Sequence, residues 1–506
     1  MLHNTTYILK NTLYLFFRQI LIIFIGLYTV RVRLDLLGME NYGIYNVVAG
    51  VVIMFTFLRS SMSSATQRFL NYAIGENNIE QVRNIFSVSI IINLFLALLI
   101  IFLSETIGLI FFYKILKIPQ ERQSAALIVY QITILSTIVN IFIIPYTSTI
   151  ISNEKMSFFA LISIIEATLK LSIIYILSII NFDKLIIYSI LILLTDLIIL
   201  FCQIIYCNFK FKYIYFSFCK DRQLYKKLSL FSVWSVLGGF AQLSNSQGLN
   251  IMMNYFHGVL INAAMGIATQ VNTTVNTFVT NFQTAFHPSI IKSYAIKDHN
   301  YYMKLIFQTS KISFFLSFLF VLPLYINMEF VLFIWLNNIP EYSVIFTRLL
   351  LLNSLEISLT NPFLMAVQAT GNIKKYQILT SSFIFANLPL SFIFLFLGFV
   401  PYFVLIIRII LGITSFIFRV YYLNKNINLP VIIFIKEVII PLIIMTIIAS
   451  FFSFSISKLF ENWNKLLITC LISSFSIIFL FYFIVFTQQE KLSINKWIKS
   501  KLLFKI

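Results

Sequence analysis

Residues 84–104 read NIFSVSIIINLFLALLIIFLS, a stretch in which no side chain is charged. A helix rises about 1.5 Å per residue, so a run of this length crosses the roughly 30 Å hydrocarbon layer of a bilayer. The strands of a membrane β-barrel would alternate apolar and polar residues, and this stretch does not. It therefore predicts a transmembrane helix.

The remainder of the chain has the same apolar character. Apolar residues make up 59% and charged residues 11% of the 506 residues, against roughly 45–50% and 25% in soluble domains. So few charges cannot cover a water-soluble surface, which excludes a soluble enzyme and a disordered chain. The sequence contains no histidine cluster, Walker lysine loop or dinucleotide-binding glycine pattern, so we expect no catalytic residues, no metal site and no cofactor.

Windows of membrane-crossing length predict about fourteen spans. They cover residues 12–31, 42–61, 85–112, 125–147, 157–180, 184–206, 229–254, 259–285, 305–327, 342–366, 376–399, 402–423, 437–456 and 465–486. The connections between them are short. We therefore predict an all-α integral membrane protein without an extramembrane domain.

Lysine and arginine are unevenly distributed over alternate loops. One set of loops carries about 24 of these residues and the opposite set about eight. The positive-inside rule places the richer set, which includes both termini, in the cytoplasm. The net charge of +19 therefore reflects membrane topology, and we expect no nucleic-acid partner. The basic C-terminal tail is either a helix on the cytoplasmic leaflet or a solvated segment.

An internal repeat relates the two halves of the chain. LNYAIGENN after the second predicted span resembles IKSYAIKDH after the eighth, with Tyr72-Ala73-Ile74 aligned on Tyr294-Ala295-Ile296 at an offset of 222. The repeated unit holds six spans, and an even number preserves orientation, so the halves are parallel repeats with pseudo-two-fold symmetry. The predicted parts are a six-helix lobe at 1–206, a basic cytoplasmic linker at 207–228, a second six-helix lobe at 229–423, and two extra helices with a basic tail at 424–506.

Small polar residues recur every three or four positions along the eighth predicted span, which places them on one helix face. They include Gly266, Thr269, Thr273, Asn276 and Thr280. Weaker stripes pass through Asn46 on the second span and Gln242 on the seventh. Such stripes either mediate close helix packing or line a hydrated passage. Because they occur on repeat-equivalent spans, the second and the eighth, we favour the passage.

Eight charged residues are candidates for positions near the centre of the bilayer, where a charge costs about 2.5–3.5 kcal/mol on insertion scales. They are Arg18, Glu166, Lys170, Asp196, Lys311, Arg348, Glu356 and Arg408. Glu166 and Lys170 have the i,i+4 spacing of a helix-surface ion pair. Asp196 either binds a cation or pairs with another span. Glu356 is a candidate coupling residue, or it forms an internal salt bridge with Arg348.

The segments FFRQILIIFIGLYTVRVRLDLLGMENYGIYNVVAGVV and SSATQRFLNYAIG, within residues 16–75, resemble the start of bacterial polysaccharide-biosynthesis flippases. These proteins translocate O-antigen and capsule repeat units, and they belong to the multidrug/oligosaccharidyl-lipid/polysaccharide exporter superfamily. The resemblance implies a two-lobe transporter that works by alternating access and is not an enzyme. Its cavity would be lined by the first, second, seventh and eighth spans, with Arg18, Arg59 and Arg348 as cations that bind the substrate.

The substrate that the resemblance implies is an undecaprenyl-pyrophosphate-linked oligosaccharide for lipopolysaccharide or capsule, moved to the periplasmic leaflet of the bacterial inner membrane. Further partners would be membrane lipid, a polysaccharide polymerase and a chain-length regulator. Two alternatives stay open: a multidrug exporter of the same superfamily, and a membrane polysaccharide polymerase or glycosyltransferase. The excess of Arg and Lys favours an anionic substrate over a cationic drug. The enzymes usually carry a large outer loop, which this sequence lacks.

Overall fold

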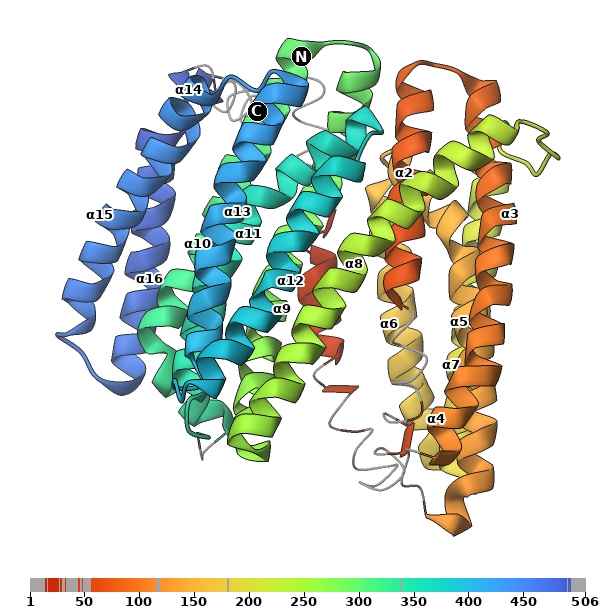
Figure 1. Ribbon diagram of the computed structural model, residues 1–506, viewed down its shortest axis with the longest axis horizontal. Coiled ribbons are helices and arrows are strands. Elements are labelled where there is room, and N and C mark those ends of the chain that lie inside the picture. The colour runs from red at the N-terminus through yellow and green to blue at the C-terminus, as the bar shows by residue number, and fades with distance from the viewer. Residues whose placement is uncertain are drawn as a thin grey trace, which may run out of the picture. The chain divides into compact units, whose positions relative to one another are not determined.

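The computed structural model describes residues 14–15, 17–26, 28–29, 32, 44–45, 48, 56–114, 119–179, 182–336, 339–488 and 490–492. These residues are almost entirely helical and contain no strand. Ten of the helices in this part of the chain are long and apolar enough to cross a membrane. The prediction of a multi-pass, all-α membrane protein is therefore confirmed (Figure 1).

The chain divides into two compact units, one with the described residues up to Gly239 and one from Phe240 onward. This boundary lies inside helix α8, Arg222–His257, whereas the predicted linker at 207–228 comes before most of that helix. The helices of the first unit are Phe17–Gly26, α2 (Thr56–Gly75), α3 (Ile79–Leu103), α4 (Leu109–Lys114), α5 (Gln123–Ser152), α6 (Met156–Ile179) and α7 (Lys184–Lys210).

In the described part of the second unit, eight further α-helices follow α8. They are α9 (Val259–Ala295), α10 (His299–Leu336), α11 (Ser343–Thr370), α12 (Lys374–Phe396), α13 (Phe403–Ile427), α14 (Val431–Phe434), α15 (Ile440–Ser457) and α16 (Asn462–Leu480). Helices α8 and α9 coincide with the seventh and eighth predicted spans, but their polar stripes keep them out of the ten apolar helices. The first two predicted spans lie partly outside the described residues.

Helix contacts follow one pattern in both units, each considered by itself. In the first unit α2 packs on α3 and α5, α3 packs on α5, and α7 packs on α5 and α6. In the second unit α9 packs on α10 and α11, α10 packs on α11, and α13 packs on α11 and α12. Helices α2, α3, α5, α6 and α7 thus correspond to α9–α13, in the order expected of a parallel repeat.

The turns that end α2 and α9 are the same Schellman motif. After α2, the backbone N–H of Asn78 donates to the carbonyl of Ala73, and Asn77 has a positive φ of 55°. After α9, the N–H of Asp298 donates to the carbonyl of Ser293, and Lys297 has a φ of 59°.

The next helix also begins in the same way in both units. The side chains of Asn78 and Asp298 each accept a hydrogen bond of 3.0 Å from the backbone N–H three residues later, which is the geometry of an N-cap. The equivalent turn residues, Asn77 and Lys297, are 220 positions apart. The turns thus give an offset of 220, two residues smaller than the offset of about 222 obtained by matching identical residues.

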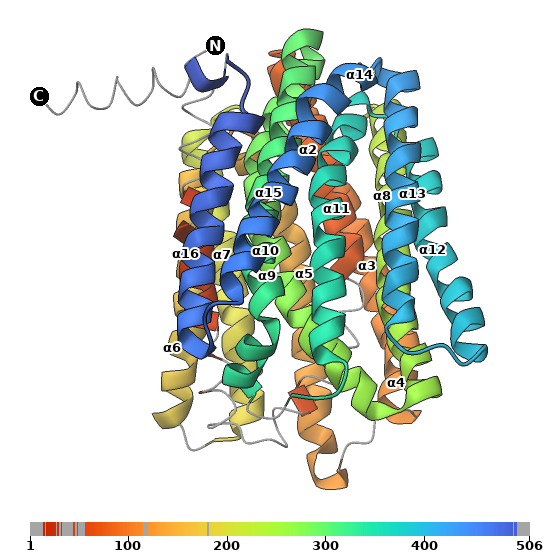
Figure 2. The same ribbon diagram turned by 90° about the vertical axis from the view of Figure 1, so that its left-hand side faces the viewer.

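Helices α15 and α16 pack against each other and against α10 (Figure 2). A buried ion pair joins the segment after α16 to α10: Lys311 Nζ lies 3.3 Å from Glu490 Oε2, and the two side chains are only 1% and 9% exposed. The same carboxylate oxygen accepts hydrogen bonds from the backbone N–H and the hydroxyl of Thr487. Lys311, which the sequence places inside a span, is thus paired within the protein.

Cysteine labelling tests the predicted orientation of these helices. In a variant without the four native cysteines, we expect Tyr215→Cys and Asn372→Cys to react with an impermeant maleimide only from the cytoplasmic side. Phe460→Cys should react only from outside. All three positions are exposed in turns or loops, so the reagent can reach them. Labelling of position 215 from outside would contradict the orientation given by the basic residues.

Candidate functional site

A cluster of charged side chains lies among the helices of the first unit. On α6, Lys170 Nζ lies 2.6 Å from Glu166 Oε1, which confirms the ion pair predicted from the i,i+4 spacing. Lys170 also interacts electrostatically with Asp196 of α7. Arg59 of α2, whose side chain is exposed, interacts with Glu166 and Asp196.

Arg18 joins this cluster through α6. Its side chain is 8% exposed; Nη1 donates to Ser163 Oγ at 3.3 Å, and the guanidinium lies 4.8 Å from the centre of the Phe159 ring. Ser163 shares one face of α6 with Glu166 and Lys170, because the three are spaced i, i+3 and i+7. The cluster, which we call the first-unit charge cluster, thus contains three cations and two carboxylates: Arg18, Arg59, Lys170, Glu166 and Asp196.

The sequence does not reveal the part played by α6. The spacing of Ser163, Glu166 and Lys170 indicates a shared helix face. An ion pair between Glu166 and Lys170 alone, however, already explains both charges, so the sequence gives no reason to expect a further partner. Only the packing of the first helix on α6 brings Arg18 to this face. The structure therefore brings together Arg18, Arg59 and Asp196 from the predicted site residues and adds a third cation, Lys170.

Asp196 is buried at the interface of α5 and α7. Its Oδ2 accepts hydrogen bonds from the side-chain amide of Asn140, at 2.9 Å, and from the hydroxyl of Ser136. Both donors belong to α5. Since a buried carboxylate is costly without donors, these neutral groups stabilise Asp196 within the first unit.

Glu356 lies at the equivalent interface of the second unit, between α11 and α13. A Cβ placed on Gly412 of α13 would come within 3.1 Å of Glu356 Oε2, so the carboxylate packs directly on the glycine. Its Oε1 is buried and has no hydrogen-bond partner in the described part of the chain. Arg408 and Arg419, one on each side of Gly412 along α13, interact with Glu356 electrostatically.

The second unit does not pair Glu356 with Arg348, the alternative raised by the sequence. Arg348 Nε donates to the carbonyl of Tyr325 at 3.0 Å. Each unit therefore contains a carboxylate at the same helix interface, α5–α7 or α11–α13, buried for Asp196 and half-buried for Glu356. The helix that supplies it differs, because Asp196 comes from α7 and Glu356 from α11.

The polar stripe of α9 lies on an exposed face. Thr269, Thr273 and Thr280 are exposed and Asn276 is half-buried, while Ala268 and Val275, which lie outside the stripe, are buried. The hydroxyls of Thr273 and Thr280 donate to carbonyls three residues earlier in their own helix. Their oxygen lone pairs are thus left to accept hydrogen bonds from outside.

The other predicted site residues are distributed as follows. Gln242 on α8 is exposed, as a residue of a polar passage would be. Asn46 lies outside the described residues. Arg348 lines a separate pocket between α10, α11 and α16, and no residue of the α9 stripe or the first-unit charge cluster lines that pocket.

Substitution of Gly412 tests the position of Glu356. For a transporter that uses Glu356 as the coupling residue, as the sequence predicts, Gly412→Ala should lower transport about two- to fivefold and Gly412→Val more than tenfold, because the added carbons displace the carboxylate. Transport in liposomes, with thermal unfolding of both variants as a control for folding, provides the measurement. Wild-type transport by Gly412→Val would show that transport does not depend on the contact between Glu356 and Gly412.

No protein-family model matches this sequence, and no curated protein matches it. Solved structures of MATE proteins do match. One, a crystal structure of a MATE mutant, has a TM-score of 0.72 at 15% identity and covers 82% of this chain and 96% of that one. Another, the outward-facing conformation of a multidrug resistance MATE family transporter of the MOP superfamily, has a TM-score of 0.71 at 15% identity, with 83% and 96% covered.

A third match is a MOP superfamily transporter from Pyrococcus furiosus, whose description reports a reverse polarity of the binding pocket. Its TM-score is 0.67 at 14% identity, and the match covers 83% of this chain and 96% of that one. These similarities show that the chain has the fold of MATE transporters of the MOP superfamily. At the level of the fold, the resemblance seen in residues 16–75 is therefore confirmed.

Proposed function

We propose that this protein is a transporter that moves an undecaprenyl-pyrophosphate-linked oligosaccharide from the cytoplasmic to the outer leaflet by alternating access. The observation that carries the proposal is the first-unit charge cluster, in which Arg18, Arg59 and Lys170 outnumber two carboxylates. A surplus of cations within membrane-spanning helices suits an anionic substrate.

The chemistry of the side chains matches the parts of such a substrate. A guanidinium group binds phosphate oxygens through two parallel hydrogen bonds, which assigns the pyrophosphate to Arg18 and Arg59. Thr269, Thr273 and the other residues of the α9 stripe offer acceptors to sugar hydroxyls. A pyrophosphate and several sugars cannot cross hydrocarbon unaided, because each polar group without a partner costs several kcal/mol. The prenyl chain stays in the lipid.

Export of a cationic drug is the second candidate. One of the matching folds is described as a multidrug resistance transporter, and Asp196 and Glu356 are carboxylates that a cation would contact. The excess of arginine and lysine disfavours this candidate, since a drug cation would be repelled by Arg18 and Arg59.

Reconstitution into liposomes separates the candidates. We expect purified protein to move a fluorescent undecaprenyl-pyrophosphate oligosaccharide between leaflets, measured with an impermeant quencher, and to leave a lipophilic dye cation where it is. Arg18→Ala/Arg59→Ala protein at equal density is the control. Dye transport without lipid movement would establish the multidrug candidate, and elongation of the oligosaccharide would point to a polymerase or glycosyltransferase.

A further inference from the structure

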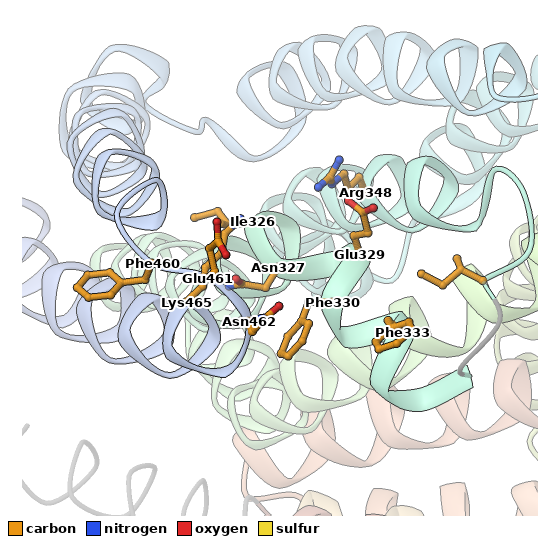
Figure 3. Close-up of a pocket in the computed structure, with 11 residues that line it drawn as sticks. Ile326, Asn327, Glu329, Phe330, Phe333, Arg348, Phe460, Glu461, Asn462 and Lys465 are labelled. Carbon is orange, nitrogen blue, oxygen red and sulfur yellow. The ribbon is translucent and has the colours of Figure 1, made fainter.

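A pocket of about 430 Å³ lies at one end of the second unit, where α10, the start of α11 and the start of α16 converge (Figure 3). Its volume is within the roughly 300–1,000 Å³ of small-molecule sites. The lining includes four charged residues, Glu329, Arg348, Glu461 and Lys465, together with Asn327 and several aromatic side chains. By the predicted topology, this end of the unit faces outward.

The four charges are balanced but do not pair with one another. Among the described residues, no acid and base of this set come within the 4.0 Å of an ion pair. Glu329 and Arg348 lie on one side of the pocket, and Glu461 and Lys465 on the other (Figure 3). One acid and one base on each side of the pocket complement a ligand that carries both signs of charge.

Asn327 supplies a second, independent indication of a ligand. Helix α10 is distorted at this residue, which lies four positions after Pro323. The amide of Asn327 is 3% exposed, and its Nδ2 donates to the carbonyl of Pro323 at 2.9 Å and to the hydroxyl of Thr469 at 2.6 Å. Its Oδ1 is buried without a partner in the described chain, and Asn327 lines the pocket, so this oxygen is left to accept from an N–H or O–H donor of a ligand.

The pocket lies beside a surface suited to lipid. Trp463 is exposed and packs edge-on against Phe330, with ring centres 5.5 Å apart, as in the aromatic belts at membrane interfaces. Helices α15 and α16 expose large apolar side chains along their length, among them Ile447, Phe451, Leu471 and Phe475. A head group in the pocket would therefore have its acyl chains along these two helices.

We propose that this pocket binds the head group of an ethanolamine phospholipid in the outer leaflet. The phosphate is bound by Arg348 and Lys465, and the ammonium group by Glu329, Glu461 and the Oδ1 of Asn327. A phosphate–ammonium zwitterion satisfies both acids and both bases. An anionic glycerol lipid would leave the acids without a partner, and a choline head group has no N–H for Asn327.

Native mass spectrometry of the purified full-length protein tests this proposal. The protein is mixed with phosphatidylethanolamine, phosphatidylglycerol and phosphatidylcholine of identical acyl chains, and the bound lipids are counted. We expect the ethanolamine lipid to be retained at least tenfold more than the other two. Glu461→Gln and Lys465→Gln should each reduce that preference about tenfold, and Glu461→Lys should shift retention toward the glycerol lipid. Glu461 is exposed, so these changes leave the core intact.

Two variants at the same end of the unit are matched controls. Glu341→Gln and Lys458→Gln remove one charge each outside the pocket lining, and both should keep the wild-type preference. Equal retention of the three lipids, or an unchanged preference in Glu461→Gln and Lys465→Gln, would overturn the proposal. So would displacement of the lipid by soluble phosphoethanolamine at an equal concentration, because the site would then belong to a soluble zwitterion.

Discussion

Arg18→Ala and Arg59→Ala are each expected to lower transport of the lipid-linked oligosaccharide about a hundredfold, with the protein inserted at the wild-type level. Loss of charge-assisted hydrogen bonds costs about 1.5–3 kcal/mol each, and a factor of ten corresponds to about 1.4 kcal/mol. Lysine at either position should restore only part of the activity, since it keeps the charge but loses the planar pair of donors. Leaflet exchange in liposomes measures the effect.

The same experiment distinguishes substrate binding from a structural role. Arg122, which forms a 2.6 Å ion pair with Asp183, is a matched control, because both partners are partly exposed and such pairs contribute about 0–1 kcal/mol. Arg122→Ala should therefore transport normally. If Arg18 only anchors its helix on Ser163 and Phe159, then Arg18→Ala will lose thermal stability and the residual folded protein will transport at the wild-type rate. Full activity of both alanine variants would exclude the pyrophosphate assignment.

Glu356→Gln is expected to slow turnover about tenfold and to remove its dependence on a proton or Na⁺ gradient, while dependence on membrane potential stays. A pyrophosphate diester carries about two negative charges, and each charge gains about 2.3 kcal/mol per 100 mV on leaving the cytoplasm. A membrane potential of about 100 mV thus favours export by roughly 4–5 kcal/mol when the head group crosses the full potential. The empty carrier, with its surplus of cations, receives no such help on its return.

A carboxylate that takes up a cation can assist that return step. Glu356 is suited to this role because its Oε1 has no hydrogen-bond partner in the described chain, whereas Asp196 is already bound by Asn140 and Ser136. Liposomes in which the ion gradient and the potential are imposed separately measure the two responses. Asp196→Asn is the comparison: a lost gradient response there, with a wild-type response in Glu356→Gln, would place coupling in the first unit.

Membrane-spanning helices and ion pairs within one helix can be predicted from the sequence, because each depends only on residues that are close together in the chain. The run of residues 84–104 lies within a membrane-spanning helix, as its length and lack of charge predict. Glu166 and Lys170 form the ion pair that their i,i+4 spacing predicts. Contacts between helices that are far apart in the sequence cannot be predicted from residue spacing. The packing of Glu356 on Gly412, and of Arg18 on Ser163, depends on which helix faces meet.

The polar residues of α8 and α9 make these two helices harder to recognise as membrane spans from the sequence. Helices α8 and α9 carry enough polar residues to fall below the hydropathy of the ten clear spans, although both are long enough to cross a bilayer. The sequence groups Arg348 with Arg18 because both are arginines inside spans. In the structure their surroundings differ, since Arg348 donates to the carbonyl of Tyr325 and lines the pocket of the second unit, whereas Arg18 donates to Ser163 of the first unit. Residue type alone cannot distinguish the two environments.

The ion pair between Lys311 and Glu490 can form only after nearly the whole chain has been synthesised. The partners are 179 residues apart, and a ribosome that adds about 5–20 residues per second needs roughly 10–35 s to reach the second after the first. During that interval the ammonium group of α10 has no carboxylate. A nascent chain released early keeps this defect, which costs about 3–5 kcal/mol once the lysine is buried. We therefore expect membrane proteases that act on partly open proteins to degrade incomplete chains faster than complete ones.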